Sequence, residues 1–171
     1  MHSMGAGTVV DVTPETSAQL AARLAARWFD EWSVGEVFET RSHRMDQGRM
    51  IEFAEEFDPQ RFHIDVAAAT ESIYGGLIAS GWHSTAVMMR LLTEFLGPSS
   101  IGASGIDRLR WVVPVRPNDE VRLRFIVLDV EPSVRKPDRG VVNARCELVN
   151  QDDIVVMSLE PRMLLLRRPN T

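Results

Sequence analysis

The chain has 171 residues, a length typical of a single domain. Apolar residues make up 44% of it and charged residues 25%, which is ordinary for a globular protein with a substantial core. Its net charge of −5 gives no electrostatic reason to expect nucleic acid or an anionic membrane as a partner. The single lysine, Lys136, lies in a turn-like segment, so we do not expect Schiff-base or lysine-base chemistry.

Cysteine usage and the apolar runs bear on the compartment in which the protein works. One cysteine, Cys146, excludes an intrachain disulfide, which fits a reducing compartment. The N-terminus lacks the basic start and apolar run of a signal peptide. The longest stretch without acidic or basic side chains, residues 73–89, is shorter than the roughly 20 residues of a bilayer span. We therefore expect a soluble, cytoplasmic protein, and the cysteine and histidine spacings predict no metal site.

The first third of the chain predicts two helices and a strand. Thr13-Pro14-Glu15 combines a capping residue, a proline and an early acid, which is typical of a helix start, and apolar residues follow it at helical spacing. Val34-Gly35 breaks that pattern, and Asp46 can cap a further helix. In order, we predict a helix over 14–31, a strand over 36–44 and a short helix over 47–57.

The middle of the chain predicts a loop, a short alanine-rich helix and then a long helix. The loop and the short helix occupy residues 58–73. Residues 75–96 form the most apolar segment, and their apolar side chains do not fit one narrow stripe, which is typical of a helix buried nearly all round. At about 1.5 Å per residue, such a helix would run about 30 Å, the width of a small domain. Gly97-Pro98 would end it.

The remainder of the chain predicts strands. Alternation of apolar and polar residues is clearest in the segments that begin at Val121 and at Val142. The predicted strands cover residues 104–113, 119–131, 140–150 and 153–167. One strand, then helices, then a run of strands is not the alternating pattern of a doubly wound sheet. It favours the α+β class, with one curved antiparallel sheet around one helix, as in the hotdog fold. We assign residues 1–34 to an N-terminal extension with one helix and residues 35–171 to the hotdog domain.

The segment Asp58-Pro59-Gln60-Arg61-Phe62-His63 places a carboxylate and an imidazole five residues apart. Pro59 biases Asp58 away from helical geometry, and a loop can bring both side chains to one point. Because imidazole titrates near neutral pH, the pair could hold a water molecule and move protons in both directions. Alternatively, Asp58 caps the helix that follows and His63 is an ordinary core or surface histidine. The spacing alone favours this second interpretation.

The surrounding residues favour the first interpretation, because residues 53–83 resemble the MaoC-like dehydratases, the (R)-specific enoyl-CoA hydratase group. One branch of that family carries the motif D-P-Q-P-x-H, which Asp58, Pro59, Gln60 and His63 match. Further matches follow at Asp65, Ala69, Gly75, Gly76, Ala79, Gly81, Trp111, Pro114, Val115 and Asp119. The resemblance covers about residues 35–167, which is much more specific than the short motif.

The resemblance implies a homodimer or higher oligomer that converts a trans-2-enoyl thioester to an (R)-3-hydroxyacyl thioester, or the reverse. Asp58 and His63 would hold and activate the water, and a backbone N–H near Gly81 would stabilise charge on the thioester oxygen. A glycine there would let the thioester approach closely. The substrate would be an acyl-CoA or an acyl carrier protein thioester, with no separate cofactor. Arg61 and Met89 depart from the family pattern, which has proline and serine there.

Other candidate residues are given ordinary roles. His83, on the long helix, is predicted to be a hydrogen-bonded core residue rather than part of an acyl pocket. Cys146 is predicted to be a core residue. Alternating arginines on the strands predict a solvated sheet face in preference to a clamp for phosphates; they are Arg108, Arg110, Arg122 and Arg124.

Two other functions stay open at this point. Hotdog thioesterases use a carboxylate or polar group on the central helix, commonly without the loop histidine, and would release free thiol from a saturated acyl-CoA. A non-catalytic subunit would bind thioesters or help an assembly form without turning substrate over.

Overall fold

The computed structural model describes residues 27–169. Most of the helix predicted over 14–31 lies outside the described residues. Where the two overlap, the prediction is wrong in part, because residues 27 and 28 are not helical and Phe29–Glu31 forms a single 3-10 turn, η1. The Trp28 N–H donates to the Glu31 carboxylate at 3.0 Å. A short capped turn therefore replaces the end of the predicted helix.

The strands form one antiparallel sheet in the order β1-β4-β5-β6-β3, and β2 also pairs with β4. In chain order they are β1 Val37–Glu39, β2 His43–Arg44, β3 Ser100–Trp111, β4 Glu120–Pro132, β5 Arg139–Val149 and β6 Val155–Leu166. The strands predicted after residue 100 are confirmed with shifted ends. The alternation that predicted β4 places Val121, Leu123 and Phe125 in the core, where none of them has exposed surface.

The strand predicted over 36–44 is divided into β1 and β2. At Thr40 the side chain enters the ladder, because the Leu123 N–H donates to Thr40 Oγ1 at 3.0 Å. The Thr40 N–H still donates to the Leu123 carbonyl at 2.9 Å. Three residues of this segment then lie opposite two of β4 before pairing resumes at His43 and Val121. The extra residue makes a bulge, which a two-residue alternation cannot reveal.

The long helix, α5 Gly81–Leu96, begins six residues later than the sequence predicts. Gly75 and Gly76 have φ values of +62° and +155°, which a right-handed helix does not accommodate. Ser80 caps the helix instead, with its hydroxyl accepting the Trp82 N–H at 3.2 Å. The prediction of a helix buried nearly all round is also wrong in part, since 56% of Trp82 and 44% of Met89 are exposed in the single chain.

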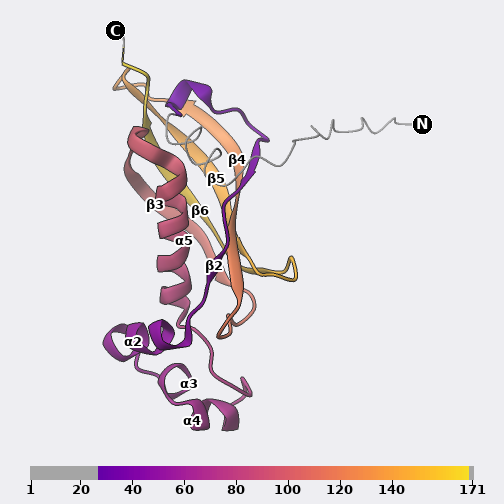
Figure 1. Cartoon of the computed structure of the whole chain (residues 1–171). Coiled ribbons are helices and arrows are strands. Elements are labelled where there is room, and N and C mark those ends of the chain that lie inside the picture. Colours follow the sequence, from indigo (N-terminus) through magenta and orange to yellow (C-terminus); the bar gives the residue numbers. More distant parts are fainter. Residues whose placement is uncertain (1–26, 170–171) are drawn as a thin grey trace, which may run out of the picture.

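The sheet curves along α5 (Figure 1). Buried apolar side chains of α5 and of the strands form one core cluster. Met88 and Leu91 of α5 are fully buried against it, as is Cys146 of β5, which confirms that this cysteine is a core residue. Three short helices lie together at the N-terminal end of α5: α2 Gln47–Phe57, α3 Arg61–Ile64 and α4 Val66–Glu71 (Figure 1). The predicted cap of α2 is confirmed, because Asp46 accepts the Arg49 N–H. The α+β hotdog architecture is confirmed.

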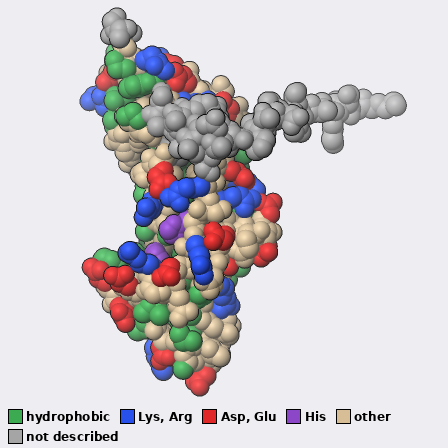
Figure 2. Space-filling model, viewed as in Figure 1, with side chains coloured by type: hydrophobic (Ala, Val, Ile, Leu, Met, Phe, Trp, Pro, Cys, Tyr) green, Lys and Arg blue, Asp and Glu red, His purple; other side chains and the backbone are tan. Residues whose placement is uncertain are grey.

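The outer surface of the small helices is acidic. Figure 2 shows acidic side chains gathered over α2, where Glu52, Glu55 and Glu56 are exposed. Within residues 27–169, no helix is long and apolar enough to cross a membrane.

Candidate functional site

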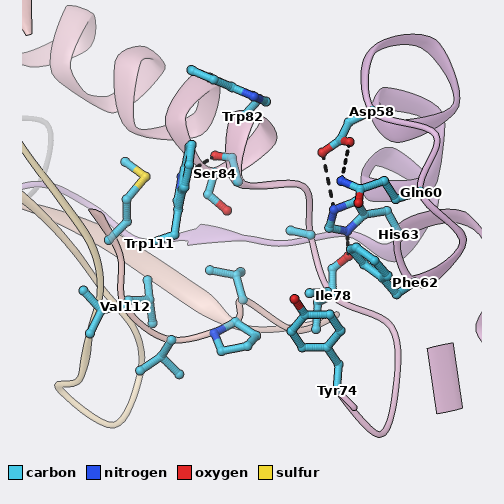
Figure 3. Close-up of a pocket in the computed structure, with 17 residues that line it drawn as sticks. Asp58, Gln60, Phe62, His63, Tyr74, Ile78, Trp82, Ser84, Trp111 and Val112 are labelled. Carbon is cyan, nitrogen blue, oxygen red and sulfur yellow. Dashed lines mark hydrogen bonds and ion pairs between the residues drawn. The ribbon is translucent and has the colours of Figure 1, made fainter. Parts of the chain in front are cut away.

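A cleft of about 530 Å³ opens at the N-terminal end of α5. Its walls come from the turn between α2 and α3, the loop of residues 74–80, the first turn of α5, the connection between β3 and β4, and β6 (Figure 3). Three predicted site residues line this cleft: Asp58, His63 and Gly81.

The structure brings the side chains of Asp58 and His63 together (Figure 3). Asp58 ends α2 in a non-helical conformation, which agrees with the effect expected of Pro59. His63 lies on α3, and its Nε2 atom is 3.3 Å from Asp58 Oδ2. In the described residues, the Asp58 carboxylate contacts other side chains and does not cap α3, so the capping interpretation is wrong.

The contacts of His63 determine which ring nitrogen carries hydrogen. Nδ1 lies 2.9 Å from the Ile78 carbonyl oxygen, which can only accept, so Nδ1 must be the donor. In the neutral ring, Nε2 then carries a lone pair that faces the Asp58 carboxylate. Two acceptors cannot bond to each other, so a proton on Nε2 or a water molecule must supply the hydrogen between them. Nε2 is therefore the ring nitrogen that the fold directs toward Asp58 and leaves without a backbone partner among the described residues.

The environment of Asp58 keeps its side chain ionised. Burial acts to raise the pKa of this carboxyl, but hydrogen bonds and the charge of His63 outweigh it, and the pKa is lowered. Gln60 Nε2 donates to Oδ1 at 2.8 Å, and the Ser80 hydroxyl donates to Oδ2 at 2.7 Å. Sequence analysis did not single out Ser80, which is fully buried. Its position as a helix cap before Gly81 was the signal that could have identified it.

Gly81 is the first residue of α5, so its N–H has no carbonyl partner within the helix. Two neighbouring donors, the Trp82 and Ser84 N–H groups, both bond to Ser80. Within residues 27–169, the Gly81 N–H has no partner and lies at the wall of the cleft. It also lies at the positive end of the helix dipole.

Packing against Trp111 gives one reason for a glycine at position 81. A Cβ atom there would lie 2.6 Å from Cε2 and 2.8 Å from Cδ2 of Trp111. The Trp111 indole also donates from Nε1 to the Gly81 carbonyl at 2.9 Å, and its ring packs edge-on against Trp82. Close packing of Trp111 therefore requires the missing side chain, and the expected close approach of a thioester stays a prediction.

Residues 30–148 match the MaoC like domain family. The chain belongs to this family. The MaoC-like dehydratase from Rhodospirillum rubrum is 37% identical, with a TM-score of 0.79, over 85% of this chain and 100% of that chain. The uncharacterized protein YdeM of Bacillus subtilis is 31% identical over 140 residues, which is 81% of this chain and 98% of that protein. An (R)-hydratase from Pseudomonas aeruginosa, 24% identical, shares the fold with a TM-score of 0.67 over 82% of this chain and 86% of that chain.

The two departures from the MaoC-like pattern lie outside the cleft. The Arg61 side chain is 79% exposed and lies 3.6 Å from Asp65. Met89 lines a second, mostly apolar cavity of about 180 Å³ between α5, β3 and β6. Arg61 therefore leaves the Asp58–His63 contact intact. Met89 contributes to the size and shape of the second cavity.

His83 is not the hydrogen-bonded core residue that was predicted. It is half-buried, its ring stacks on Phe53 of α2 with centroids 4.8 Å apart, and its Nδ1 atom is buried without a hydrogen-bond partner among the described residues. Burial, together with the charge of nearby His43, lowers the pKa of His83. His83 does not line the cleft.

The alternating arginines divide into two groups. Arg122 and Arg124 form ion pairs with Glu39 and Asp153 at 2.5 to 3.1 Å, so they belong to a charge-balanced sheet surface. Arg108 and Arg110 line a separate hollow with Glu160. None of the four lines the cleft that holds Asp58.

Proposed function

We propose that this MaoC-like protein adds water to trans-2-enoyl thioesters to give (R)-3-hydroxyacyl thioesters, or catalyses the reverse elimination. The observation that carries this proposal is the orientation of His63. Its Nδ1–H is bound to the Ile78 carbonyl, so Nε2 faces Asp58 Oδ2 at 3.3 Å within an open cleft. An unprotonated nitrogen and a carboxylate directed at one point can together orient and deprotonate a water molecule.

In the proposed hydration, Asp58 accepts one hydrogen of the water and His63 Nε2 takes the other as the water oxygen bonds to the β-carbon. The lowered pKa of Asp58 keeps it an acceptor at neutral pH. The protonated His63 then delivers its proton to the α-carbon, so that the elements of water add across the double bond. Negative charge that develops on the thioester oxygen is stabilised by the Gly81 N–H at the start of α5.

The second, mostly apolar cavity suits an acyl chain. The second cavity is lined mainly by Met, Leu, Ile, Ala and Pro side chains, and Met157 beside it also lines the cleft. Thr85 Oγ1 lies 3.4 Å from Met157 Sδ at the border of the two spaces. Coenzyme A or the pantetheine of a carrier protein would then arrive as part of the substrate, with the acyl chain directed along α5.

A second copy of the chain is the partner that the sheet edge suits. Among the described residues, β3 pairs with β6 alone. Three apolar side chains of this strand are 41 to 47% exposed: Ile101, Ile106 and Trp111. An unpaired edge with apolar side chains is normally covered in a stable protein. Trp82 and Met89 of α5 extend this exposed surface. The proposed homodimer would bury the β3 edge and these two side chains of α5.

Hydration of crotonyl-CoA tests the proposed function, followed as loss of the enoyl thioester absorbance. Asp58→Asn and His63→Ala should each reduce turnover by at least about 10²-fold, since acid–base groups contribute on that scale. Asp65→Asn is the matched control, because asparagine can still cap α4 in place of Asp65 and that residue does not line the cleft. Turnover at the wild-type level in both site variants would exclude this mechanism.

The two alternatives predict different products. A hotdog thioesterase would use a carboxylate or polar group on α5 at the cleft. Glu94, the acid of α5, is bound to Arg41 near the other end of the helix, so Ser84, which lines the cleft, is the side chain that could take this role. Release of free thiol from a saturated acyl-CoA would favour that function. Binding of enoyl-CoA without turnover would favour a non-catalytic subunit.

A further inference from the structure

The loop of residues 74–80 contacts both Asp58 and His63. Its Ile78 carbonyl accepts the Nδ1–H of His63 at 2.9 Å, and its Ser80 hydroxyl donates to Asp58 at 2.7 Å. Ser80 also starts α5 and thereby leaves the Gly81 N–H free. The position of this loop therefore sets the position of the proposed base, its carboxylate partner and the proposed oxyanion donor.

The loop has little regular structure to fix its shape. It contains no helix or strand, and its two glycines, Gly75 and Gly76, both have positive φ. Such residues lose more conformational entropy on folding than others, so an ordered conformation requires contacts from elsewhere in the chain.

Some of those contacts are backbone hydrogen bonds from the loop to α3 and α4. Further contacts come from Arg116, about forty residues further along the chain, in the connection between β3 and β4. Its guanidinium donates to the Tyr74 carbonyl at 2.5 Å and to the Gly76 carbonyl at 3.0 Å. The Leu77 carbonyl lies 3.5 Å from the same Nη1 atom. Within residues 27–169, no carboxylate forms an ion pair with Arg116. The guanidinium therefore contacts these backbone carbonyl groups instead of an acidic side chain.

Arg116 is itself held in place. Its backbone N–H donates to Asp119 Oδ2 at 2.7 Å in a tight turn. The preceding residue, Val115, accepts the Ala79 N–H at 2.9 Å. The connection therefore holds the loop at two points: Val115 near its end and the Arg116 guanidinium at its start.

We propose that Arg116 is a positioning residue for the hydration, because it holds the 74–78 segment in the shape that presents the Ile78 carbonyl to His63. This inference rests on the proposed function. Loss of the guanidinium leaves the Val115–Ala79 bond in place, so α5 and the sheet keep their structure. The segment that orients the imidazole then relaxes, and turnover falls more than substrate binding does. A lysine cannot replace the guanidinium, since it lacks the planar fork that reaches two carbonyls at once.

The test uses Arg116→Ala and Arg116→Lys in the full chain with crotonyl-CoA as substrate. Both variants should lose kcat on the order of 10²-fold, with KM changed much less, because small misplacements of a catalytic group cost that much. Guanidinium chloride, far below concentrations that unfold proteins, should restore part of the kcat of Arg116→Ala. Sodium chloride at equal ionic strength should not. Arg122→Ala is the matched control, since Arg122 also donates to a backbone carbonyl, that of Asn150 at 3.0 Å, but away from the cleft.

Two results would overturn the inference. One is a folded Arg116→Ala variant with unchanged kcat. The other is a loss of kcat that guanidinium does not restore and that Arg122→Ala shares in equal measure, which would indicate a general loss of stability. If the wild-type protein hydrates no enoyl thioester, the proposed function fails, and the positioning role is then decided by NMR. The exchange of the His63 Nδ1 proton with water should be faster in Arg116→Ala and slow again with guanidinium. Equal exchange in wild type and variant would refute it.

Discussion

Replacement of Gly81 by alanine should destabilise the protein through Trp111. The added Cβ would lie 2.6 to 2.8 Å from three atoms of the indole ring, closer than real Cβ contacts, so the ring must move. Movement weakens the hydrogen bond from Nε1 to the Gly81 carbonyl, worth about 1 kcal/mol, and disturbs the edge contact with Trp82, worth about 0.5–1.5 kcal/mol. Alanine recovers up to about 1 kcal/mol of helix propensity. The net cost should be about 1–2 kcal/mol.

Urea unfolding followed by circular dichroism measures this cost as a free energy of unfolding. Thermal unfolding should show a fall in Tm of about 2–8 °C for a chain of this size. Trp111→Val provides the second arm of a double-mutant cycle, because valine removes the ring that the new Cβ would meet. In that background, Gly81→Ala should be neutral or stabilising. An equal cost of Gly81→Ala with and without Trp111 would show that the ring does not explain the glycine.

Two further predictions concern polar groups beside the site. Ser80→Ala removes the cap of α5 and a hydrogen bond to Asp58, so it should cost about 1 kcal/mol and raise the pKa of Asp58. Because that pKa is lowered on folding, Asp58 stabilises the fold at pH values above its unfolded pKa. The difference in unfolding free energy between wild type and Ser80→Ala, measured by urea unfolding at several pH values, should therefore narrow as pH falls through the folded pKa. A difference that stays constant with pH would contradict this. His83→Phe keeps the stack on Phe53 and removes a nitrogen that is buried without a partner among the described residues. Because the pKa of His83 is lowered on folding, the stability that this variant gains over wild type should grow as pH falls below the pKa of an ordinary histidine. A gain that does not change with pH would contradict this.

Sequence reasoning identified the sheet because its signal is local. Alternation of buried and half-buried residues through β4 and β5 reflects the two faces of a strand, and neighbouring residues alone reveal it. The bulge after β1 was missed because it depends on Thr40 Oγ1 accepting a hydrogen bond from Leu123, more than eighty residues away. No local pattern encodes that contact.

The candidate site shows the same division. Asp58 and His63 lie five residues apart, so a motif could bring attention to both. Ser80 donates directly to Asp58, 22 residues earlier in the chain, and Arg116 acts through carbonyl groups of the 74–80 loop. Their side chains are common types at unremarkable spacing, and only the folded chain shows what they touch.

The start of α5 shows why the helix boundary matters to the chemistry. A helix over 75–96 and an oxyanion donor at Gly81, both predicted from the sequence, are incompatible. In that helix the Gly81 N–H would donate to the Leu77 carbonyl four residues earlier and would be consumed. Because Ser80 caps α5 instead, Gly81 becomes its first residue, and its N–H at the cleft has no partner in the described part of the chain. The Ser80 hydroxyl has one hydrogen, which it donates to Asp58, while its oxygen accepts the Trp82 N–H. One buried hydroxyl thus links the helix start to the ionisation of Asp58.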